Sequence, residues 1–423
     1  MKWALYNLLF ATVYPFLLPG FLLRMLRRGG YAARMGDRFA LYPEATLGRL
    51  REGGGGFVWI HAVSVGEVQV AAQFMREWRK AEKDVRFCFS TTSSTGWRMA
   101  ERELAAEDVL IYNPLDFPSF VKSALKTVRP RAVVLVESEI WPVFIRTARK
   151  YSVPLFLINA RVSDRSAPRY RRARWFFKDV FSSFTAIFAQ SKLDGRRLIE
   201  AGAPEAIVHV TGSFKFDAAR RAAPEKEAEL REWTGRGRLL LGGSTWPGED
   251  EVLLSAYRQL LGEDGTLKLV IAPRHFEKAD DVEANIKKAG FDCVRRSRGE
   301  TARGTGREVF LADTTGELMG FYGIADAVFV GKSLREHGSQ NMIEPCLCGK
   351  PTVVGPYTEN FRPVMSELLS DDAIIQVSDA DELKLKIRSA LFDGESLGLR
   401  AAAAVESRRG TVARCVSEIR RVL

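Results

Sequence analysis

The chain has 423 residues, of which 46% are hydrophobic and 27% charged, as in an ordinary globular protein with room for two or three domains. A core of that size needs neither a structural metal nor disulfides, and the five scattered cysteines indicate reduced, mostly buried thiols in a cytoplasmic setting. The formal net charge of +11 favours an anionic partner, which could be nucleic acid, a phospholipid surface or a phosphorylated substrate.

The first segment of the chain is apolar. No charged residue occurs from Trp3 to Leu23, which is close to the length that crosses a bilayer core, and five arginines follow by position 38. We expect residues 1–28 to form a single membrane anchor that keeps the body of the protein in the cytoplasm. Pro15 and Pro19 leave open a helix lying in the membrane interface, and a buried core helix is a third reading.

After the glycine run 53–56, apolar strand-like runs alternate with helical patterns. The runs lie at residues 57–63, 85–90, 109–112, 132–136, 155–159, 186–189 and 207–210. The run at 132–136 is continuously apolar, as expected for a parallel strand that is buried on both faces. This alternation predicts an α/β fold with a parallel, doubly wound sheet over residues 29–214.

The strand pattern stops between Lys215 and Gly237, where we expect a linker between two domains. It resumes with runs at 239–244, 268–273, 309–313, 327–331 and 351–355, each followed by a helical pattern. A second α/β domain of the same architecture is therefore predicted for residues 238–423. The last helix of the chain could return to the first domain.

Carboxylates follow two strand ends in the first half. Glu67 comes directly after the strand that ends near Val63, and Glu137 and Glu139 follow the strand at 132–136. Open α/β sheets bind ligands beyond the carboxyl ends of their strands, so these carboxylates are candidates for taking a proton from a hydroxyl. The alternative for Glu67 is a glutamate that only stabilises a helix N-terminus. His61 lies within an apolar strand, as a core histidine would.

The second half has glycine turns and a cation at its strand ends. Gly338 to Pro345 reads as a glycine turn entering a helix, where free N–H groups suit a phosphate, and Glu344 could accept bonds from ribose hydroxyls. The missing Gly-Lys-Ser/Thr ending excludes a Walker loop. Arg274 could pair with a phosphate, or could form only a surface salt bridge. Other residues at strand ends that could contact a ligand are Ser244, Thr245, His275, Thr315, Gly316 and Glu317.

A basic run lies between residues 161 and 176. It contains Arg161, Arg165, Arg169, Arg171, Arg172 and Arg174, interleaved with Tyr170, Trp175 and Phe176. The run could bind nucleic acid or a phosphorylated lipid headgroup, or it could be a solvated helix face.

Taken in order along the chain, these motifs resemble a known family. The motifs are Ser64-Val65-Gly66-Glu67, Glu137-Ser138-Glu139-Ile140-Trp141-Pro142, Asn159-Ala160-Arg161, Gly243-Ser244-Thr245-Trp246, Pro273-Arg274-His275, Asp313 to Leu318 and Asn341-Met342-Ile343-Glu344-Pro345. The chain resembles the Kdo (3-deoxy-manno-octulosonic acid) transferases of lipopolysaccharide synthesis. The resemblance implies a GT-B glycosyltransferase fold, in which two Rossmann-like domains face a cleft.

The resemblance also implies an activity and a place in the cell. It implies inverting transfer of Kdo from CMP-Kdo to a lipid A precursor, without metal or cofactor, at the cytoplasmic face of the inner membrane. Glu67 would be the general base, and Glu139, with Glu137, would support the acceptor side. Ser64, Arg161 and Arg165 would meet the acceptor and its phosphates. The donor would lie near Ser244, Thr245, Arg274, His275, Thr315, Gly316, Glu317, Gly338, Ser339, Gln340, Asn341 and Glu344.

One motif departs from the family. Its usual Gly-Gly-His-Asn appears here as Gly338-Ser339-Gln340-Asn341, and the imidazole of His337 stands three residues before Gln340. Two other hypotheses stay open. One is a GT-B enzyme with another nucleotide sugar and acceptor. The other is a membrane-associated protein that binds nucleic acid through the arginine run, which leaves the strand-end motifs unexplained.

Overall fold

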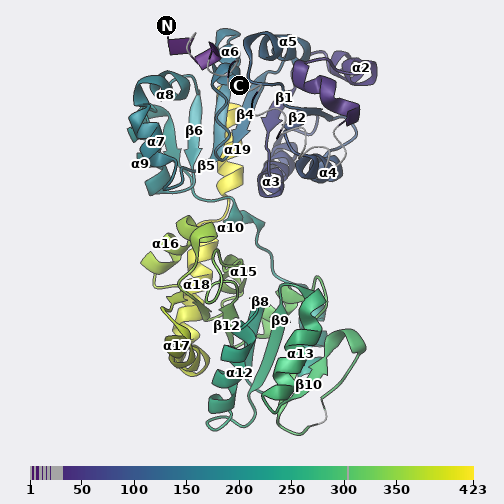
Figure 1. The fold of residues 1–423 in the computed structure, drawn as a ribbon, viewed down its shortest axis with the longest axis vertical. Coiled ribbons are helices and arrows are strands. Elements are labelled where there is room, and N and C mark those ends of the chain that lie inside the picture. Colours follow the sequence, from purple (N-terminus) through teal and green to yellow (C-terminus); the bar gives the residue numbers. More distant parts are fainter. Residues whose placement is uncertain are drawn as a thin grey trace. The chain divides into compact units, whose positions relative to one another are not determined.

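The computed structural model describes residues 2–3, 6–8, 12, 16, 20, 32–302 and 304–423 of the chain. They form two compact units, Met1–Phe214 with Gly410–Leu423, and Lys215–Arg409 (Figure 1). Most of the expected anchor, residues 1–28, lies outside the described residues. Within the described part of the chain, no helix is both long enough and apolar enough to cross a membrane.

The first unit is built on a seven-stranded sheet in the order β3-β2-β1-β4-β5-β6-β7, in which every pair of neighbours is parallel. The strands are β1 (Val58–His61), β2 (Phe87–Thr91), β3 (Val109–Tyr112), β4 (Ala132–Val136), β5 (Leu155–Ala160), β6 (Ala186–Ala189) and β7 (Val208–Val210). The helices are α2 (Glu44–Glu52), α3 (Val65–Ala81), α4 (Ser94–Glu103), α5 (Pro118–Val128), α6 (Pro142–Lys150), α7 (Ala167–Arg172), α8 (Arg174–Phe181), α9 (Lys192–Glu200) and α19 (Thr411–Val422).

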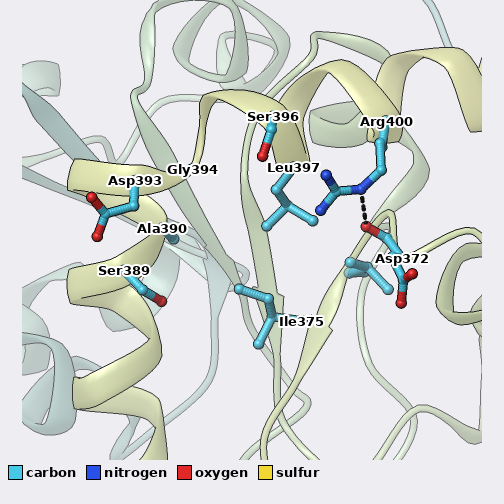
Figure 2. A pocket seen from close by; sticks show the side chains of 10 residues that line it. Asp372, Ile375, Ser389, Ala390, Asp393, Gly394, Ser396, Leu397 and Arg400 are labelled. Carbon is cyan, nitrogen blue, oxygen red and sulfur yellow. Dashed lines mark hydrogen bonds between the residues drawn. The ribbon is translucent and has the colours of Figure 1, made fainter.

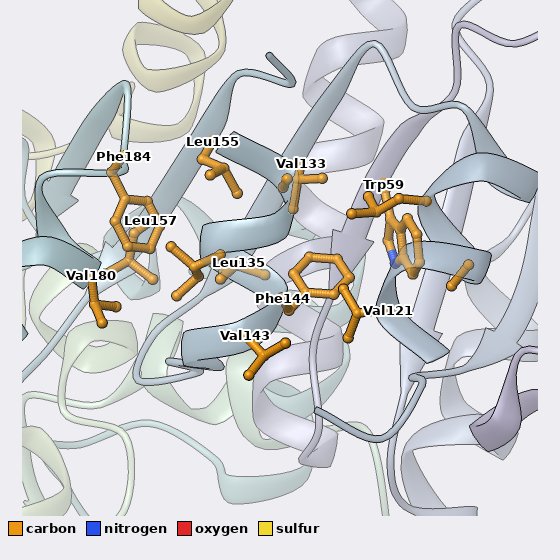
Figure 3. Packing of buried hydrophobic residues seen from close by; sticks show 14 of the residues in the cluster. Trp59, Val121, Val133, Leu135, Val143, Phe144, Leu155, Leu157, Val180 and Phe184 are labelled. Carbon is orange, nitrogen blue, oxygen red and sulfur yellow. The ribbon is translucent and has the colours of Figure 1, made fainter. Parts of the chain in front are cut away.

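Successive strand residues of this sheet feed two separate cores. Val58 and Ile60 of β1 belong to the cluster on one face, and Trp59 belongs to the cluster on the other. On the second of these faces Trp59 meets Phe144 of α6 edge-on, with 5.0 Å between ring centroids (Figure 3). Because both faces are covered, the strands read as unbroken apolar runs, and each large buried side chain contributes roughly 1.5–3 kcal/mol.

The second unit repeats this architecture with the order β10-β11-β9-β8-β12-β13-β14, again all parallel. Its strands are β8 (Leu239–Thr245), β9 (Lys268–Pro273), β10 (Asp292–Arg295), β11 (Glu308–Leu311), β12 (Ala327–Val330), β13 (Thr352–Val354) and β14 (Ile375–Gln376). Its helices are α10 (Lys215–Ala218), α11 (Pro224–Thr234), α12 (Glu249–Leu260), α13 (Ala279–Lys288), α14 (Leu318–Ile324), α15 (Ile343–Leu347), α16 (Arg362–Ser370), α17 (Ala380–Asp393) and α18 (Glu395–Ser407). The predicted pair of parallel α/β domains is confirmed.

The second unit begins at Lys215 and not after a linker, and the last helix of the chain returns to the first unit, as the sequence allowed. Residues 215–237 are no linker, because Phe216 and Leu230 are buried in the core of the second unit and α11 packs on α14. The C-terminal helix α19 leaves that unit and packs on α3 of the first, where Val416 and Ile419 complete the core. Apolar faces on both segments explain these attachments, because an amphipathic helix must bury its apolar stripe.

Each sheet has a central point at which its strand order changes direction. In the first unit this point lies between β1 and β4, and in the second between β8 and β12. Chains leaving two such neighbouring strands diverge to opposite sides of the sheet, so a crevice opens beyond their carboxyl ends. Each unit therefore has one crevice at which a ligand site is expected.

Candidate active site

Glu67 lies in the crevice of the first unit, in the first turn of α3. Ser64 caps this helix by accepting a bond from Glu67 N–H at 3.2 Å, and Glu67 Oε2 accepts bonds from Val63 N–H at 2.8 Å and Ser64 N–H at 3.2 Å. Both bonds fall on Oε2, and Oε1 has no hydrogen bond to the described residues. The capping role that the sequence offered as the alternative is therefore present, and it leaves one oxygen able to receive a proton.

Glu139 lies on the loop that leaves β4, on the other side of the same crevice. Its Oε2 accepts a bond from Trp141 Nε1 at 2.8 Å and lies 3.5 Å from His61 Nε2. Burial alone would raise the pKa of Glu139, but the contacts with His61 and Trp141 outweigh burial and hold the pKa below its usual value. Glu139 is thus a carboxylate that stays charged although its side chain is only 17% exposed.

Glu137 is bound to the end of the neighbouring strand. Asn159 Nδ2 donates to its Oε1 at 3.2 Å, and Arg161 Nε lies 3.6 Å from its Oε2. Its backbone has a φ of +57°, which turns the chain sharply as it leaves β4. Glu137 is therefore tied to β5, while Arg161, whose side chain is 47% exposed, keeps part of its guanidinium available.

The basic run forms an exposed surface over α7, α8 and the loop before them. Trp175 is 60% exposed and the apolar side chains of Phe176 and Val180 point inward. The exposed cations are Arg161, Arg165, Arg169, Arg171, Arg172 and Arg174. An exposed aromatic ring among arginines suits an interface that carries phosphates beside apolar chains.

The second unit has a pocket in its crevice. A cavity of about 230 Å³ is lined by Ser244, Arg274, Thr315, Gly316 and Glu317, together with Ala272, Pro273, Phe276, Ala312, Thr314, Leu318 and Phe321. It adjoins an open hollow of about 670 Å³ over Phe276 and residues 313–317. The Arg274 side chain is exposed, and no partner for it is found among the described residues. Five of the residues predicted to bind the donor, including the exposed Arg274, thus line one pocket.

Other predicted donor residues lie outside this pocket. Thr245 and His275 line a neighbouring cavity of about 100 Å³, where His275 meets Trp246 with 4.8 Å between ring centroids. Gly338, Ser339, Gln340, Asn341 and Glu344 line none of these cavities. Ser339 is 3% exposed, and its hydroxyl donates to Gln340 O at 3.1 Å.

The predicted turn from Gly338 does enter a helix, α15, and Glu344 lies in the first turn of that helix, but the helix is short. The helix α15 begins only at Ile343 and has five residues, because Pro345 supplies no N–H and Gly349, with φ +71°, ends the turn. Asn341 Oδ1 accepts from Ile343 N–H at 3.1 Å, and Glu344 sits in the first turn. Burial raises the pKa of Glu344, partly offset by its bond with Asn341.

Glu249, which the sequence did not single out, joins the two strand ends of the second crevice. It is fully buried, and both of its carboxylate oxygens accept two backbone N–H bonds each. The donors are Trp246 at 2.8 Å, Lys332 at 2.9 Å, Ser333 at 3.1 Å and Leu334 at 3.0 Å. Close approach also requires a glycine here, since a Cβ on Gly331 would stand 2.3 Å from Ser244 O. A Glu three residues into a strand-to-helix turn is the signal that could have revealed this role.

Glu317 is held by cations on its own unit. Lys226 Nζ lies 2.5 Å and Arg296 Nη2 3.0 Å from its Oε1, and the Thr314 hydroxyl bonds its Oε2. Burial raises the pKa of Glu317, but Arg296, Lys226 and Thr314 together lower it to about 2. The carboxylate therefore fixes the turn at residues 313–318 that lines the pocket.

A further hollow of the second unit lies among α17, α18 and β14 (Figure 2). Its volume is about 300 Å³, and Arg400 Nε bonds Asp372 O at its edge at 2.8 Å. None of the predicted site residues lines it. Among the described residues, no group of three or more His, Cys, Asp or Glu side chains could hold a metal ion.

Comparison with known proteins shows the family of the chain. A family profile described as 3-deoxy-D-manno-octulosonic-acid transferase (kdotransferase) matches residues 33–218. A 3-deoxy-D-manno-octulosonic acid transferase of Haemophilus influenzae is 31% identical over 92% of this chain and 91% of its own length. The transferase of the same name from Bordetella pertussis is 33% identical over 82% of this chain and 83% of its own. The chain belongs to this family.

The chain is thus a glycosyltransferase of the Kdo transferase family. Solved structures of lower identity share its fold. Anabaena HepE in complex with UDP superposes with a TM-score of 0.57 at 14% identity, covering 87% of this chain and all (100%) of its own. The UDP-GlcNAc 2-epimerase of Neisseria meningitidis superposes with a TM-score of 0.52 at 12% identity, covering 84% and 99%. These likenesses establish the fold, two Rossmann-like units as in GT-B glycosyltransferases.

Proposed function

We propose that this transferase moves Kdo from CMP-Kdo to the lipid A precursor with inversion at the anomeric carbon. The observation that carries this proposal is the pairing of opposite chemistries at the two crevices. Among the described residues, Glu67 of the first crevice has one carboxylate oxygen without a hydrogen bond, and Arg274 in the pocket of the second has no side-chain partner. A glycosyl transfer from a phosphate leaving group needs both a base and an anion site.

In the proposed reaction, Glu67 takes the proton of the acceptor hydroxyl as the oxygen attacks the anomeric carbon of Kdo. The bond between that carbon and the phosphate oxygen breaks, and CMP leaves with the bonding electron pair. Arg274 and the N–H groups at Thr315 and Gly316 offset the negative charge that develops on the phosphate. A single displacement of this kind inverts the anomeric centre and needs no metal ion.

The acceptor is proposed to approach the exposed basic surface of α7 and α8. Arg161 and Arg165 would contact its phosphates, and Trp175 would lie at the level of the lipid headgroups. We propose that the enzyme works at the cytoplasmic face of the inner membrane, with the amino-terminal segment as its attachment.

A transfer assay tests this function. The detergent-solubilised protein would receive CMP-Kdo generated in situ, a tetra-acylated lipid A precursor and EDTA, with the product measured by mass spectrometry. A mass gain of one or more Kdo units supports the donor, the acceptor and metal independence together. If the folded protein gives no gain with EDTA or with Mg²⁺, the donor or the acceptor is a different one.

A further inference from the structure

His61 contacts the active-site carboxylate Glu139 from within the core of the first unit. It is the last residue of β1 and is fully buried. Its Nε2 lies 3.5 Å from Glu139 Oε2, and no hydrogen bond to Nε2 is found among the described residues. The ring also meets Trp141, the other group bound to Glu139, edge-on, with 5.9 Å between the ring centroids. Two side chains from neighbouring strand ends thus converge on a single carboxylate oxygen.

The far side of the imidazole is fixed by Ser90 on β2. His61 Nδ1 lies 3.0 Å from Ser90 O and 2.9 Å from Ser90 Oγ. Trp59 Nε1 donates to that hydroxyl at 2.8 Å, and Asn113 Oδ1 lies 3.2 Å from it. The ring is therefore anchored by buried polar groups and not only by packing, and its orientation is set by the pairing of β1 with β2.

The possible proton positions on this ring lead to the same result. If Nδ1–H donates to Ser90 O and Nε2 also carries a proton, both ring nitrogens have an acceptor. If Nδ1 instead accepts from the Ser90 hydroxyl, the single ring proton is already on Nε2. Both satisfied arrangements direct an Nε2–H toward Glu139.

We propose that His61 is a positioning residue for the transfer reaction, which fixes the Glu139 carboxylate at the crevice between β1 and β4. This inference rests on the proposed function for its kinetic consequence but not for its structural part. An orienting imidazole restricts the carboxylate to one rotamer and keeps it charged. Glu139 can then bind acceptor hydroxyls without first reorganising.

Other charged groups also face Glu139 and must be allowed for. Tyr170 of α7 has a pKa raised by burial and, secondarily, by the Glu139 charge. Glu137 lies on the same loop, with Arg161 at the end of β5 beside it. The phenol stays neutral near physiological pH, and Arg161 offsets the charge of Glu137. Among these titratable groups, His61 is therefore the one whose distance to the Glu139 carboxylate the structure records, at 3.5 Å.

The first test needs no turnover. The chain contains four histidines, so the ring resonances of ¹⁵N-histidine-labelled protein can be assigned with single His→Gln variants. Glu139→Gln should shift the ring resonances of His61 and leave those of His209, His275 and His337 in place. Unchanged His61 resonances would overturn the proposal, whether or not the enzyme is active.

The second test is a pH profile of kcat/KM for Kdo transfer. His61→Leu should lower kcat by up to about 100-fold, and should move the acidic limb to higher pH by about one unit. His61→Gln, which keeps a neutral donor, should restore part of the rate. His209→Gln is the matched control, since this imidazole is on the exposed strand β7 of the same unit.

If the acidic limb of the pH profile does not move in a folded His61→Leu protein, the proposal is contradicted. If His61→Leu does not fold, the resonance test on Glu139→Gln still decides, because it leaves His61 in place. If the unmodified protein does not transfer Kdo, only the proposed function is wrong. The contact between His61 and Glu139 is still tested by the ring resonances.

Discussion

The crevices of the two units have the same sheet topology but use their acidic residues in opposite ways. In the first unit, Glu67 bonds its own helix through one oxygen only, and Glu139 stays charged at the edge of the solvent. In the second unit, both oxygens of Glu249 are saturated by backbone N–H groups, and Glu317 is paired with Lys226 and Arg296.

This difference sets the chemistry that each crevice can perform. A carboxylate with an unbonded oxygen can take a proton, whereas one whose oxygens are all bonded can only hold the chain in place. With its acids neutralised internally, the second crevice is left with glycine turns, hydroxyls and Arg274, which suit an anion. On the proposed function, the same fold would supply a base in one unit and an anion site in the other.

The largest expected effect comes from removing the base while keeping its cap. Glu67→Gln retains a side-chain oxygen that can accept from Val63 and Ser64 N–H, so α3 should keep its N-terminus. Transfer should nevertheless fall by about 10²–10⁴-fold, since an amide cannot take the proton. Rates of Kdo transfer at saturating substrate measure the loss of activity, and the thermal midpoint shows whether the helix cap and the fold are retained.

Glu77→Gln on the same helix is the matched control, because the half-buried Glu77 pairs with Lys80 and, among the described residues, with no other cation. Its rate should equal that of the unmodified protein. Near-normal turnover by Glu67→Gln would show that Glu67 is not the base. The acids of both crevices would then have only structural roles.

The second prediction concerns stability. Glu249→Leu should lower the free energy of unfolding of the second unit by about 3–4 kcal/mol, because four N–H groups, two buried and two half-buried, lose their acceptor. Burial raises the pKa of Glu249, and its backbone hydrogen bonds oppose this rise. The expected loss of stability is therefore what remains after subtracting the desolvation cost of the buried carboxylate, which the leucine variant does not have. Calorimetry that resolves the two units measures it, with the neighbouring exposed Glu251→Leu as control. An unaltered second transition would show that the N–H groups find other partners.

The sequence was sufficient for the features that depend on local pattern. The unbroken apolar run Ala132–Val136 correctly predicted a strand buried on both faces, and with it the strand end that carries Glu137 and Glu139. The contact between His61 and Glu139 was not predictable, because it depends on β1 pairing with β4, and that register brings His61 opposite Leu135. Local periodicity carries no information about which distant strand becomes a neighbour.

The same limit applies to the second unit. The hydrogen bonds of Glu249 to the loop after β12 span 83 to 85 residues, and no sequence motif at either end predicts them. The attachment of α19 to the first unit also depends on a core completed from the far end of the chain. Local glycine and proline positions, by contrast, account for the short α15 once Pro345 and Gly349 are considered together.

A third prediction concerns a buried acid in the first unit, where Asp116 plays a part like that of Glu249. It accepts from Val143 N–H at 3.0 Å and Phe144 N–H at 2.7 Å at the start of α6, and from the Tyr6 hydroxyl at 3.1 Å. Burial raises the pKa of Asp116 to about 6, although these bonds oppose the rise. Since the folded pKa exceeds the unfolded value, the folded state binds the proton more tightly.

Stability of the first unit should therefore fall as the pH rises from about 4 to about 6, by about 3 kcal/mol from this group. The measurement is the difference in unfolding free energy between the unmodified protein and Asp116→Asn at several pH values, since other groups cancel in that difference. A difference that does not change over this range would show that Asp116 is not protonated preferentially in the folded state.

The smallest effect is expected at Glu317, where the comparison between the crevices is sharpest. The sequence placed this residue among the donor ligands, but its carboxylate is bound by Lys226 and Arg296, and its pKa is lowered to about 2 by Arg296, Lys226 and Thr314 against the effect of burial. A folded pKa below the unfolded value means that the stabilisation is full above about pH 4.5 and is lost as the pH falls toward 2. Solvent screens such pairs, so Glu317→Gln should cost only about 1 kcal/mol at pH 7, and nothing at pH 2. The exposed Glu232→Gln on α11 should cost nothing at either pH.

If Glu317 serves only to hold its turn, removing its negative charge should leave CMP affinity intact or slightly higher, as isothermal titration can measure. A marked loss of CMP affinity in a folded Glu317→Gln protein would instead make this acid a ligand of the donor, and the second crevice would then use an acid as the first one does.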